Sequence, residues 1–250
     1  MRTLVSITIL LFIACRLGYG VEREQQALVL LQQAGGSYLA GNYTKSKESY
    51  IELQQLVVTP SWSVNYNLGN TYFRLNQLGE SLFHFRLAHI LAPRRPEVSY
   101  NLKYVRQQVG QESEGQSLGV FLLPLSEREL LLLLALLSLF TAFFVIVLNY
   151  SKNEWAKWGR NLSLIFLLYP VSYGTKLYFF TPDFGVVTAK EASVYSGSGV
   201  DNVMLFKLAV GSEFEVVRSA QSVGADWMMI KMFDGKKGWI HRQQVVVSTQ

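Results

Sequence analysis

This 250-residue chain contains little cysteine and few charged residues. Its one cysteine, Cys15, excludes an internal disulfide and any zinc site built from several cysteines. Charged residues make up 16% of the chain and hydrophobic residues 50%, a balance that favours a protein with membrane segments. The net charge of +5 comes from dispersed Lys and Arg without a basic run, so we expect no nucleic-acid partner.

Residues that could carry chemistry are also few. Of the three histidines, His84 and His89 are too far apart to share one helix face, which needs a spacing of about three or four residues. His241 has no apparent nucleophile near it in the sequence. We find no Gly-rich phosphate loop, no catalytic Cys–His pair and no paired carboxylates. The sequence therefore predicts a protein without catalytic activity, cofactor or metal.

The start of the chain is typical of an export signal. Residues 1–20 combine a positive start, a short apolar stretch and small residues at Gly18 and Gly20, where signal peptidase would cleave. The apolar stretch is too short to cross a bilayer, which favours a cleaved signal over a retained anchor. A second, less favoured interpretation is a lipoprotein signal, in which Cys15 would be acylated and become the mature N-terminus.

A repeated tripeptide marks the next region. Tyr66-Asn67-Leu68 recurs as Tyr100-Asn101-Leu102, about 34 residues later, the period of tetratricopeptide (TPR) repeats. The unit from Trp62 to Arg95 matches the residue types that this family has at its pattern positions, namely Leu68, Gly69, Tyr72, Phe85, Ala88 and Pro93. Residues 21–108 thus resemble TPR repeats, which implies paired helices with a concave groove for an extended peptide or a partner helix.

The TPR resemblance also implies which side chains line the groove. By family position these are Tyr66, Asn67, Asn70, Arg74, Tyr100 and Asn101, accompanied by Phe73 and Tyr104. Asn side chains can donate to and accept from a peptide backbone, and Arg74 could pair with a carboxylate. Ordinary surface positions are the alternative reading for any single Asn.

Two apolar runs follow a polar linker at 109–129. Residues 130–148 carry no charge and would form about 28 Å of helix, which predicts a first transmembrane helix. Residues 162–180 predict a second transmembrane helix. The loop 149–161 between the two helices is basic, which predicts that this loop lies in the cytoplasm. The sequence therefore predicts a bacterial inner-membrane protein with two spans and both flanking modules outside the cytoplasm.

Short alternating segments then predict an all-β domain at 184–248. We expect strands at Gly185–Ala189, Val203–Leu208, Ser212–Arg218 and Trp227–Met232, and a fifth opening at Gly238-Trp239-Ile240. The Asp234-Gly235 turn followed by Gly-Trp-Ile resembles bacterial SH3 (SH3b) domains, which bind peptides or peptidoglycan through aromatic side chains. That resemblance implies Tyr195 and Trp227 as ligand contacts, and we expect Trp239 in the barrel core.

Taken together, the predicted fold class is a multidomain membrane protein with an all-α TPR solenoid, a two-helix transmembrane hairpin and an all-β SH3-like barrel. This order is similar to the TPR- and SH3-containing aerotolerance-operon (Bat) proteins. The resemblance implies a membrane-anchored envelope scaffold whose partners are proteins with von Willebrand factor A domains. A tether to peptidoglycan through the SH3b domain is the alternative function.

Overall fold

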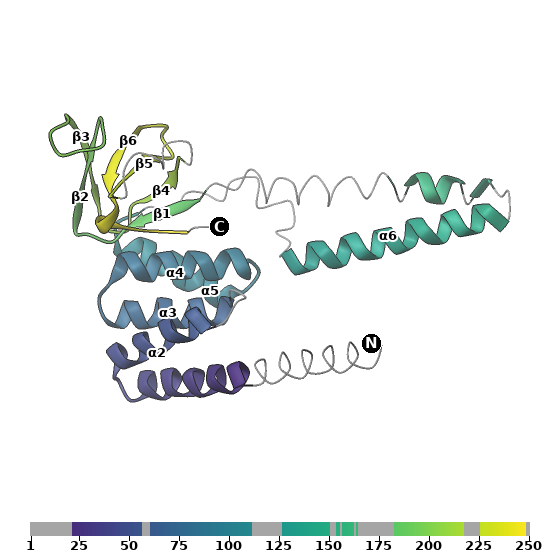
Figure 1. The fold of residues 1–250 in the computed structure, drawn as a ribbon, viewed down its shortest axis with the longest axis horizontal. Helices are drawn as coiled ribbons and strands as arrows, with labels where there is room; N and C mark the ends of the chain where they lie inside the picture. The colour runs from purple at the N-terminus through teal and green to yellow at the C-terminus, as the bar shows by residue number, and fades with distance from the viewer. Residues whose placement is uncertain are drawn as a thin grey trace, which may run out of the picture.

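The computed structural model of the chain describes residues 22–56, 61–111, 127–150, 154–155, 157–162, 164, 183–217 and 226–248. The predicted signal at 1–20, with Cys15, lies outside the described residues. The described part consists of a stack of helices, a long helix that projects from it, and a sheet that lies on the stack (Figure 1).

The helical stack contains consecutive helices that pack on one another in chain order (Figure 1). Two of its turns need a left-handed backbone conformation, supplied by Gly41 at φ 76° and Asn76 at φ 58°. Pro96 begins the last helix, where its missing N–H costs no hydrogen bond. The helices span 22–39, α2 (Tyr43–Leu56), α3 (Trp62–Arg74), α4 (Leu78–Leu91) and α5 (Pro96–Gln108).

Close contact between α3 and α4 is possible because one residue at their contact has no side chain. A Cβ at Gly69 would lie 2.8 Å from the ring of Phe85. Beside it, the Ser81 hydroxyl donates to the Gly69 carbonyl oxygen at 2.8 Å, while Leu68 and Phe85 are buried. The small residues of this unit therefore serve helix packing.

Within the described residues, seven strands between Phe184 and Val247 form one antiparallel sheet, in the order β3-β2-β6-β5-β4-β1-β7. Its own core contains Phe214, Met228, Ile230 and Ile240, all fully buried. The sequence predicted five strands and missed β2 and the three-residue β7. The strands are β1 (Phe184–Val187), β2 (Glu191–Tyr195), β3 (Met204–Ala209), β4 (Glu213–Val216), β5 (Trp227–Lys231), β6 (Lys237–His241) and β7 (Val245–Val247).

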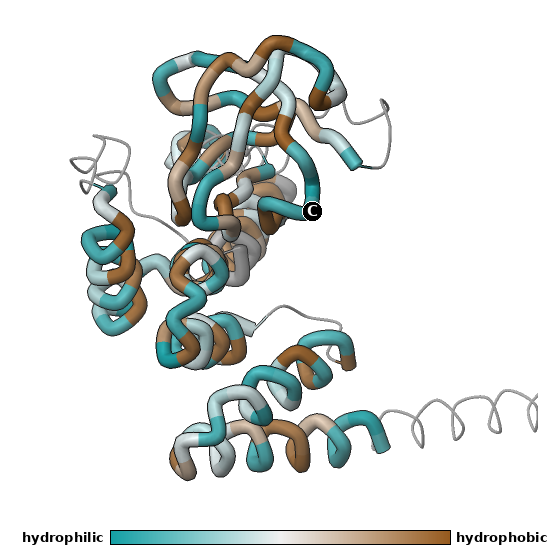
Figure 2. The backbone as a smooth tube through the Cα atoms, turned by 90° about the vertical axis from the view of Figure 1, so that its left-hand side faces the viewer, coloured by the Kyte–Doolittle hydropathy of each residue, from teal (hydrophilic) through white to brown (hydrophobic). Residues whose placement is uncertain are grey.

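The sheet and the helices share one apolar core. Phe184 and Val186 of β1 are buried against Phe83 of α4 and Val105 of α5. Figure 2 shows the sheet seated directly above the helices. The prediction of a separate TPR solenoid and a separate SH3-like barrel is therefore wrong. The physical reason is that β1 buries apolar surface on both sides, within the sheet and against the stack.

The long helix α6 (Glu127–Tyr150) runs away from the stack (Figure 1). Across the described residues, we find no helix with both the length and the apolar character that crossing a membrane requires. The prediction of a first span at 130–148 is therefore wrong, and with it the two-helix transmembrane hairpin and the inner-membrane localisation.

The uncharged run at 130–148 is only part of α6, which contacts the helical stack at its charged start. Helix α6 begins in a charged turn, Glu127-Arg128-Glu129, and Glu129 pairs with Arg94 in the turn before α5. The second predicted span and the linker lie mostly outside the described residues; 162 and 164 of the span and 109–111 and 127–129 of the linker are described.

Candidate partner-binding face

Helices α3 and α5 bring three of the predicted site residues together. The side-chain nitrogen of Asn101 donates to the Tyr66 hydroxyl and to Asn70 Oδ1, at 3.1 Å in both cases. Tyr66 and Asn70 are one helical turn apart on α3, so both face α5. Within the described residues, the side-chain oxygen of Asn101 and the side-chain NH₂ group of Asn70 have no hydrogen-bond partner and could bind a peptide backbone.

Aromatic rings extend this polar centre along α5. Phe73 contacts Tyr104 edge-on at 5.6 Å between ring centroids, and Tyr104 stacks with Tyr100 at 6.5 Å. Tyr100 is 69% exposed and Tyr104 is 42% exposed, although both are large apolar side chains. Exposed aromatic groups beside polar ones are typical of surfaces that bind partners. We call this surface the α3–α5 face; it comprises Tyr66, Asn70, Phe73, Tyr100, Asn101 and Tyr104.

Two predicted site residues lie elsewhere. Asn67 forms a side-chain hydrogen bond with the buried Tyr50 of α2. Arg74 donates from Nε to the Tyr38 hydroxyl at 3.4 Å, with its guanidinium 6.0 Å from the Tyr43 ring centroid. Both side chains therefore contact the first helix pair, away from α5, and Arg74 already has aromatic partners.

A cation borders the α3–α5 face at the start of α3. The Arg95 guanidinium lies 4.4 Å from the Trp62 ring centroid, and Trp62 lies 6.4 Å from Tyr66. Sequence reasoning missed this pair because Arg95 and Trp62 belong to different helix ends and follow no repeat spacing. Arg95 also pairs with Glu97, with 3.4 Å between Arg95 Nη1 and Glu97 Oε1.

His84 of α4 is buried and does not belong to the α3–α5 face. Its Nδ1 lies 3.0 Å from Asn65 Oδ1, and its ring stacks on Tyr72 at 5.2 Å. The Asn65 amide nitrogen donates to the Ser61 carbonyl oxygen, so Asn65 Oδ1 accepts from His84. Burial lowers the pKa of His84 to about 4. The residue is therefore a neutral structural histidine, as its spacing from His89 suggested.

A second aromatic cluster lies on the sheet. Trp227 contacts Tyr195 at 5.6 Å and His241 at 5.2 Å, both edge-on. Tyr195 and Trp227 were predicted as ligand contacts, whereas His241 was not, because its pairing with Trp227 depends on the β5–β6 register. Trp239, which was expected in the core of the β-domain, is buried, with 9% of its surface exposed.

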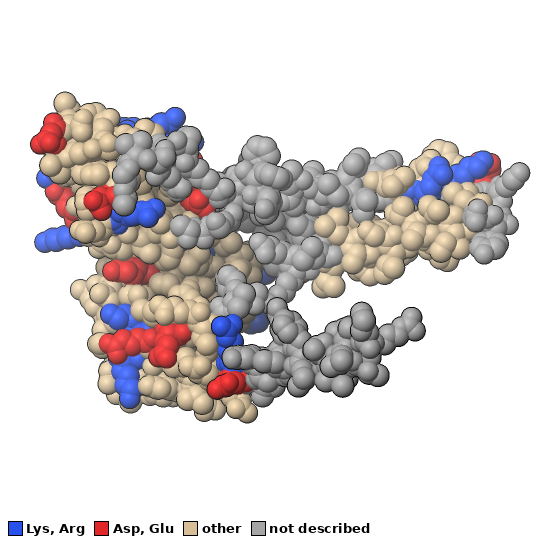
Figure 3. Space-filling view, viewed as in Figure 1, with Lys and Arg blue, Asp and Glu red and all other residues tan. Residues whose placement is uncertain are grey.

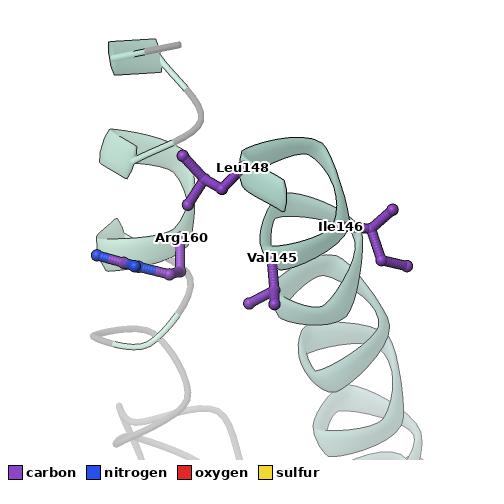
Figure 4. A pocket seen from close by; sticks show the side chains of 4 residues that line it. All are labelled: Val145, Ile146, Leu148 and Arg160. Carbon is purple, nitrogen blue, oxygen red and sulfur yellow. The ribbon is translucent and has the colours of Figure 1, made fainter. Parts of the chain in front are cut away.

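A shallow hollow of about 450 Å³ lies where α6 meets residues 157–162. Val145, Ile146, Leu148 and Arg160 line it, and Figure 4 shows Leu148 between the two segments. The Arg160 guanidinium donates to the neighbouring Asn161 side chain at 2.9 Å. A lining of three aliphatic side chains and one cation does not provide convergent polar groups for a small ligand.

Within the described residues, we find no group of three or more His, Cys, Asp or Glu side chains arranged to hold a metal ion. No protein-family model matches this chain, and the search of curated proteins also gives no match.

Proposed function

We propose that this protein is an adaptor that binds an extended segment of a partner protein on the α3–α5 face. The observation that carries the proposal is the Tyr66–Asn70–Asn101 hydrogen-bond network next to the exposed Tyr100–Tyr104 stack. The amide groups would pair with the partner's backbone, and the tyrosine rings would cover one of its apolar side chains.

The position of the sheet supports this choice of face. Strand β1 covers α4 and α5 through Phe184 and Val186, whereas Tyr100 and Tyr104 stay exposed.

Site-specific photocrosslinking tests the proposal. A photoreactive phenylalanine replaces Tyr100, and a matched protein carries the same group at Ile90, which is 48% exposed on α4. We expect a discrete crosslinked partner from position 100 and none from position 90. The proposal is wrong if both positions give the same products, or if position 100 gives none.

Loss of binding provides the second arm of the test. Tyr100→Ala removes an exposed ring and Asn70→Ala removes one acceptor of Asn101, so both variants should stay folded. We expect each to reduce partner affinity by about tenfold, because each removes a central contact worth about 1–2 kcal/mol. Ile90→Ala should bind like the unmodified protein.

The resemblance to aerotolerance-operon proteins adds a candidate for the partner. It implies proteins with von Willebrand factor A domains, so crosslinked products should be examined for such a domain by mass spectrometry. This relation stays a prediction and rests on sequence motifs alone.

A second candidate function is binding to the glycan or peptide of a bacterial cell wall through the sheet. The Tyr195–Trp227–His241 cluster favours it, because edge-on aromatic rings offer an apolar surface with polar tips. The whole chain has to be used, since the sheet shares its core with the helices. We expect Trp227→Ala to abolish cosedimentation with purified peptidoglycan and Phe233→Ala to retain it; no cosedimentation of the unmodified chain would exclude this function.

A further inference from the structure

The α3–α5 face consists of uncharged side chains. They are Tyr, Phe and Asn, none of which carries a charge near neutral pH. Helix α2, which packs against α3, has charged side chains instead, and Figure 3 shows acidic and basic groups over this part of the stack. These residues are Lys45, Lys47, Glu48 and Glu52. An uncharged partner segment therefore suits the α3–α5 face best.

Most free polar groups of this face are hydrogen-bond donors. The side-chain NH₂ group of Asn70 is free, and the Tyr66 hydroxyl accepts from Asn101, so that its own hydrogen can be donated. Tyr100 and Tyr104 are exposed, and their hydroxyls have no hydrogen-bond partner within the described residues. A bound segment with many backbone N–H groups would leave several of them unpaired on such a surface, which costs affinity. A segment with few N–H groups avoids this cost, and proline has none.

The aromatic rings of the face also have a characteristic spacing. Tyr66 and Phe73 are about 10 Å apart along α3, and Asn70 lies between them in the sequence. Tyr104 of α5 contacts Phe73 and widens the second ring site. A polyproline II helix repeats the same side after three residues, or about 9 Å, whereas an extended strand repeats it after about 7 Å. The ring spacing therefore fits polyproline II better than a strand.

We propose that the segment bound by the α3–α5 face is proline-rich and adopts the polyproline II conformation. The inference rests on the proposed function and names the chemical class of its ligand. Two prolines three positions apart pack on the ring sites at Tyr66 and at Phe73–Tyr104. The Asn70 side-chain NH₂ group donates to a backbone carbonyl oxygen between the two prolines. Because this conformation exists before binding, little conformational entropy is lost.

Binding of a model peptide to the full chain tests this inference. The probe is a fluorescein-labelled proline decamer, followed by fluorescence anisotropy. The control probe is a labelled decamer of alternating threonine and valine, which is uncharged, favours the extended strand and keeps its N–H groups. We expect the proline decamer to bind at least about tenfold more tightly than the control decamer.

An exchange of donor for acceptor locates the bound probe. Asn70→Asp keeps an oxygen that accepts from Asn101 but replaces the free NH₂ group with a second oxygen. We expect this variant to bind the proline decamer about tenfold more weakly. Asn42→Asp adds the same charge at the start of α2, where Asp also serves as an N-cap, and should bind like the unmodified chain. Far-UV circular dichroism checks that both variants stay folded.

Equal affinity for the two decamers, or no binding of the proline decamer, would overturn the proline-rich ligand. Undiminished binding in Asn70→Asp would also overturn it, because the probe would then be bound elsewhere. A discrete crosslinked partner from position 100 combined with either result would leave the adaptor function standing and remove this inference alone. Absence of any crosslinked partner would contradict the adaptor function itself.

Discussion

Single buried residues determine how the helical stack responds to acid. His84 is enclosed between Tyr72 and Phe83. Its only polar partner in the described chain is the side-chain oxygen Oδ1 of Asn65. Protonation would add a charge that neither ring nor amide oxygen stabilises as well as water does. Burial therefore holds the pKa at about 4, well below its usual value of 6.5.

Lowering the pH from 6.5 to 4 should destabilise the protein through His84. Above pH 6.5 the histidine is neutral in both states and contributes nothing. As the pH falls, the unfolded chain takes up the proton first, so the free energy of unfolding decreases by up to about 3 kcal/mol and levels off below pH 4. Glu80, whose pKa is raised by burial, acts in the opposite direction.

The contribution of His84 can be isolated by comparing variants. We expect His84→Gln to flatten the dependence of unfolding free energy on pH across this window, measured by urea denaturation. An unchanged pH dependence in His84→Gln would assign the acid sensitivity to other groups.

At the scale of elements, the contact between α4 and the sheet depends on one glycine. A Cβ at Gly79 would lie 2.5 Å from the Val187 carbonyl oxygen and 2.8 Å from the Thr188 Cα atom. Both are backbone atoms, so neither can rotate away as a side chain could. The start of α4 can approach the end of β1 this closely only without a side chain at position 79.

Gly79→Ala should therefore lower the free energy of unfolding by about 1–3 kcal/mol, the usual cost of overpacking. Gly36→Ala is the matched control, because position 36 is also helical and has no atom within 4 Å of a new Cβ. That variant should gain about 0.5–1 kcal/mol from helix propensity. Thermal denaturation of both measures the difference, and equal effects of the two would contradict the close contact at Gly79.

Elements were more predictable from the sequence than their assembly. The expected strands at 203–208, 212–218 and 227–232 overlap β3, β4 and β5, because alternating apolar residues have a local signature. β2 was missed since its inward residues, Ala192 and Val194, form too short a pattern. In the candidate site, Asn67 and Arg74 were misplaced because the repeat period assigns a helix face but not the neighbour that covers it.

For the whole molecule, one carboxylate joins the helices to the sheet. Glu213 of β4 is 6% exposed and accepts from Arg106 Nε at 2.8 Å and Nη2 at 3.1 Å, and it also pairs with Arg86. The Arg86 guanidinium lies 3.9 Å from the Phe184 ring centroid. No sequence pattern predicts these pairs, because the arginines are more than 100 positions from Glu213. This is why the sequence predicted separate domains.

Glu213→Gln should destabilise the protein by about 3 kcal/mol, because it leaves two partly buried arginines without their counter-charge. Glu215→Gln removes a more exposed pair with Lys231 and should cost about 0.5 kcal/mol or less. Far-UV circular dichroism follows the helices, and tryptophan fluorescence follows the sheet when Trp62, Trp155 and Trp158 are replaced by Phe, so that only Trp227 and Trp239 remain. The two signals should change together with Glu213 in place and separate in Glu213→Gln; coincident transitions in that variant would show that the apolar core alone couples the two parts.

Strand β1 packs on α4 and α5 and so covers one side of the helical stack. Its C-terminal side is closed by Phe184 and Val186, whereas the 22–39 helix still exposes Leu28 and Val29 at the other side. Extra helical hairpins grafted before residue 22 would therefore displace none of the described residues, but a hairpin inserted after Gln108 would have to displace the sheet. Evolution and protein engineering can lengthen this stack only toward its N-terminus.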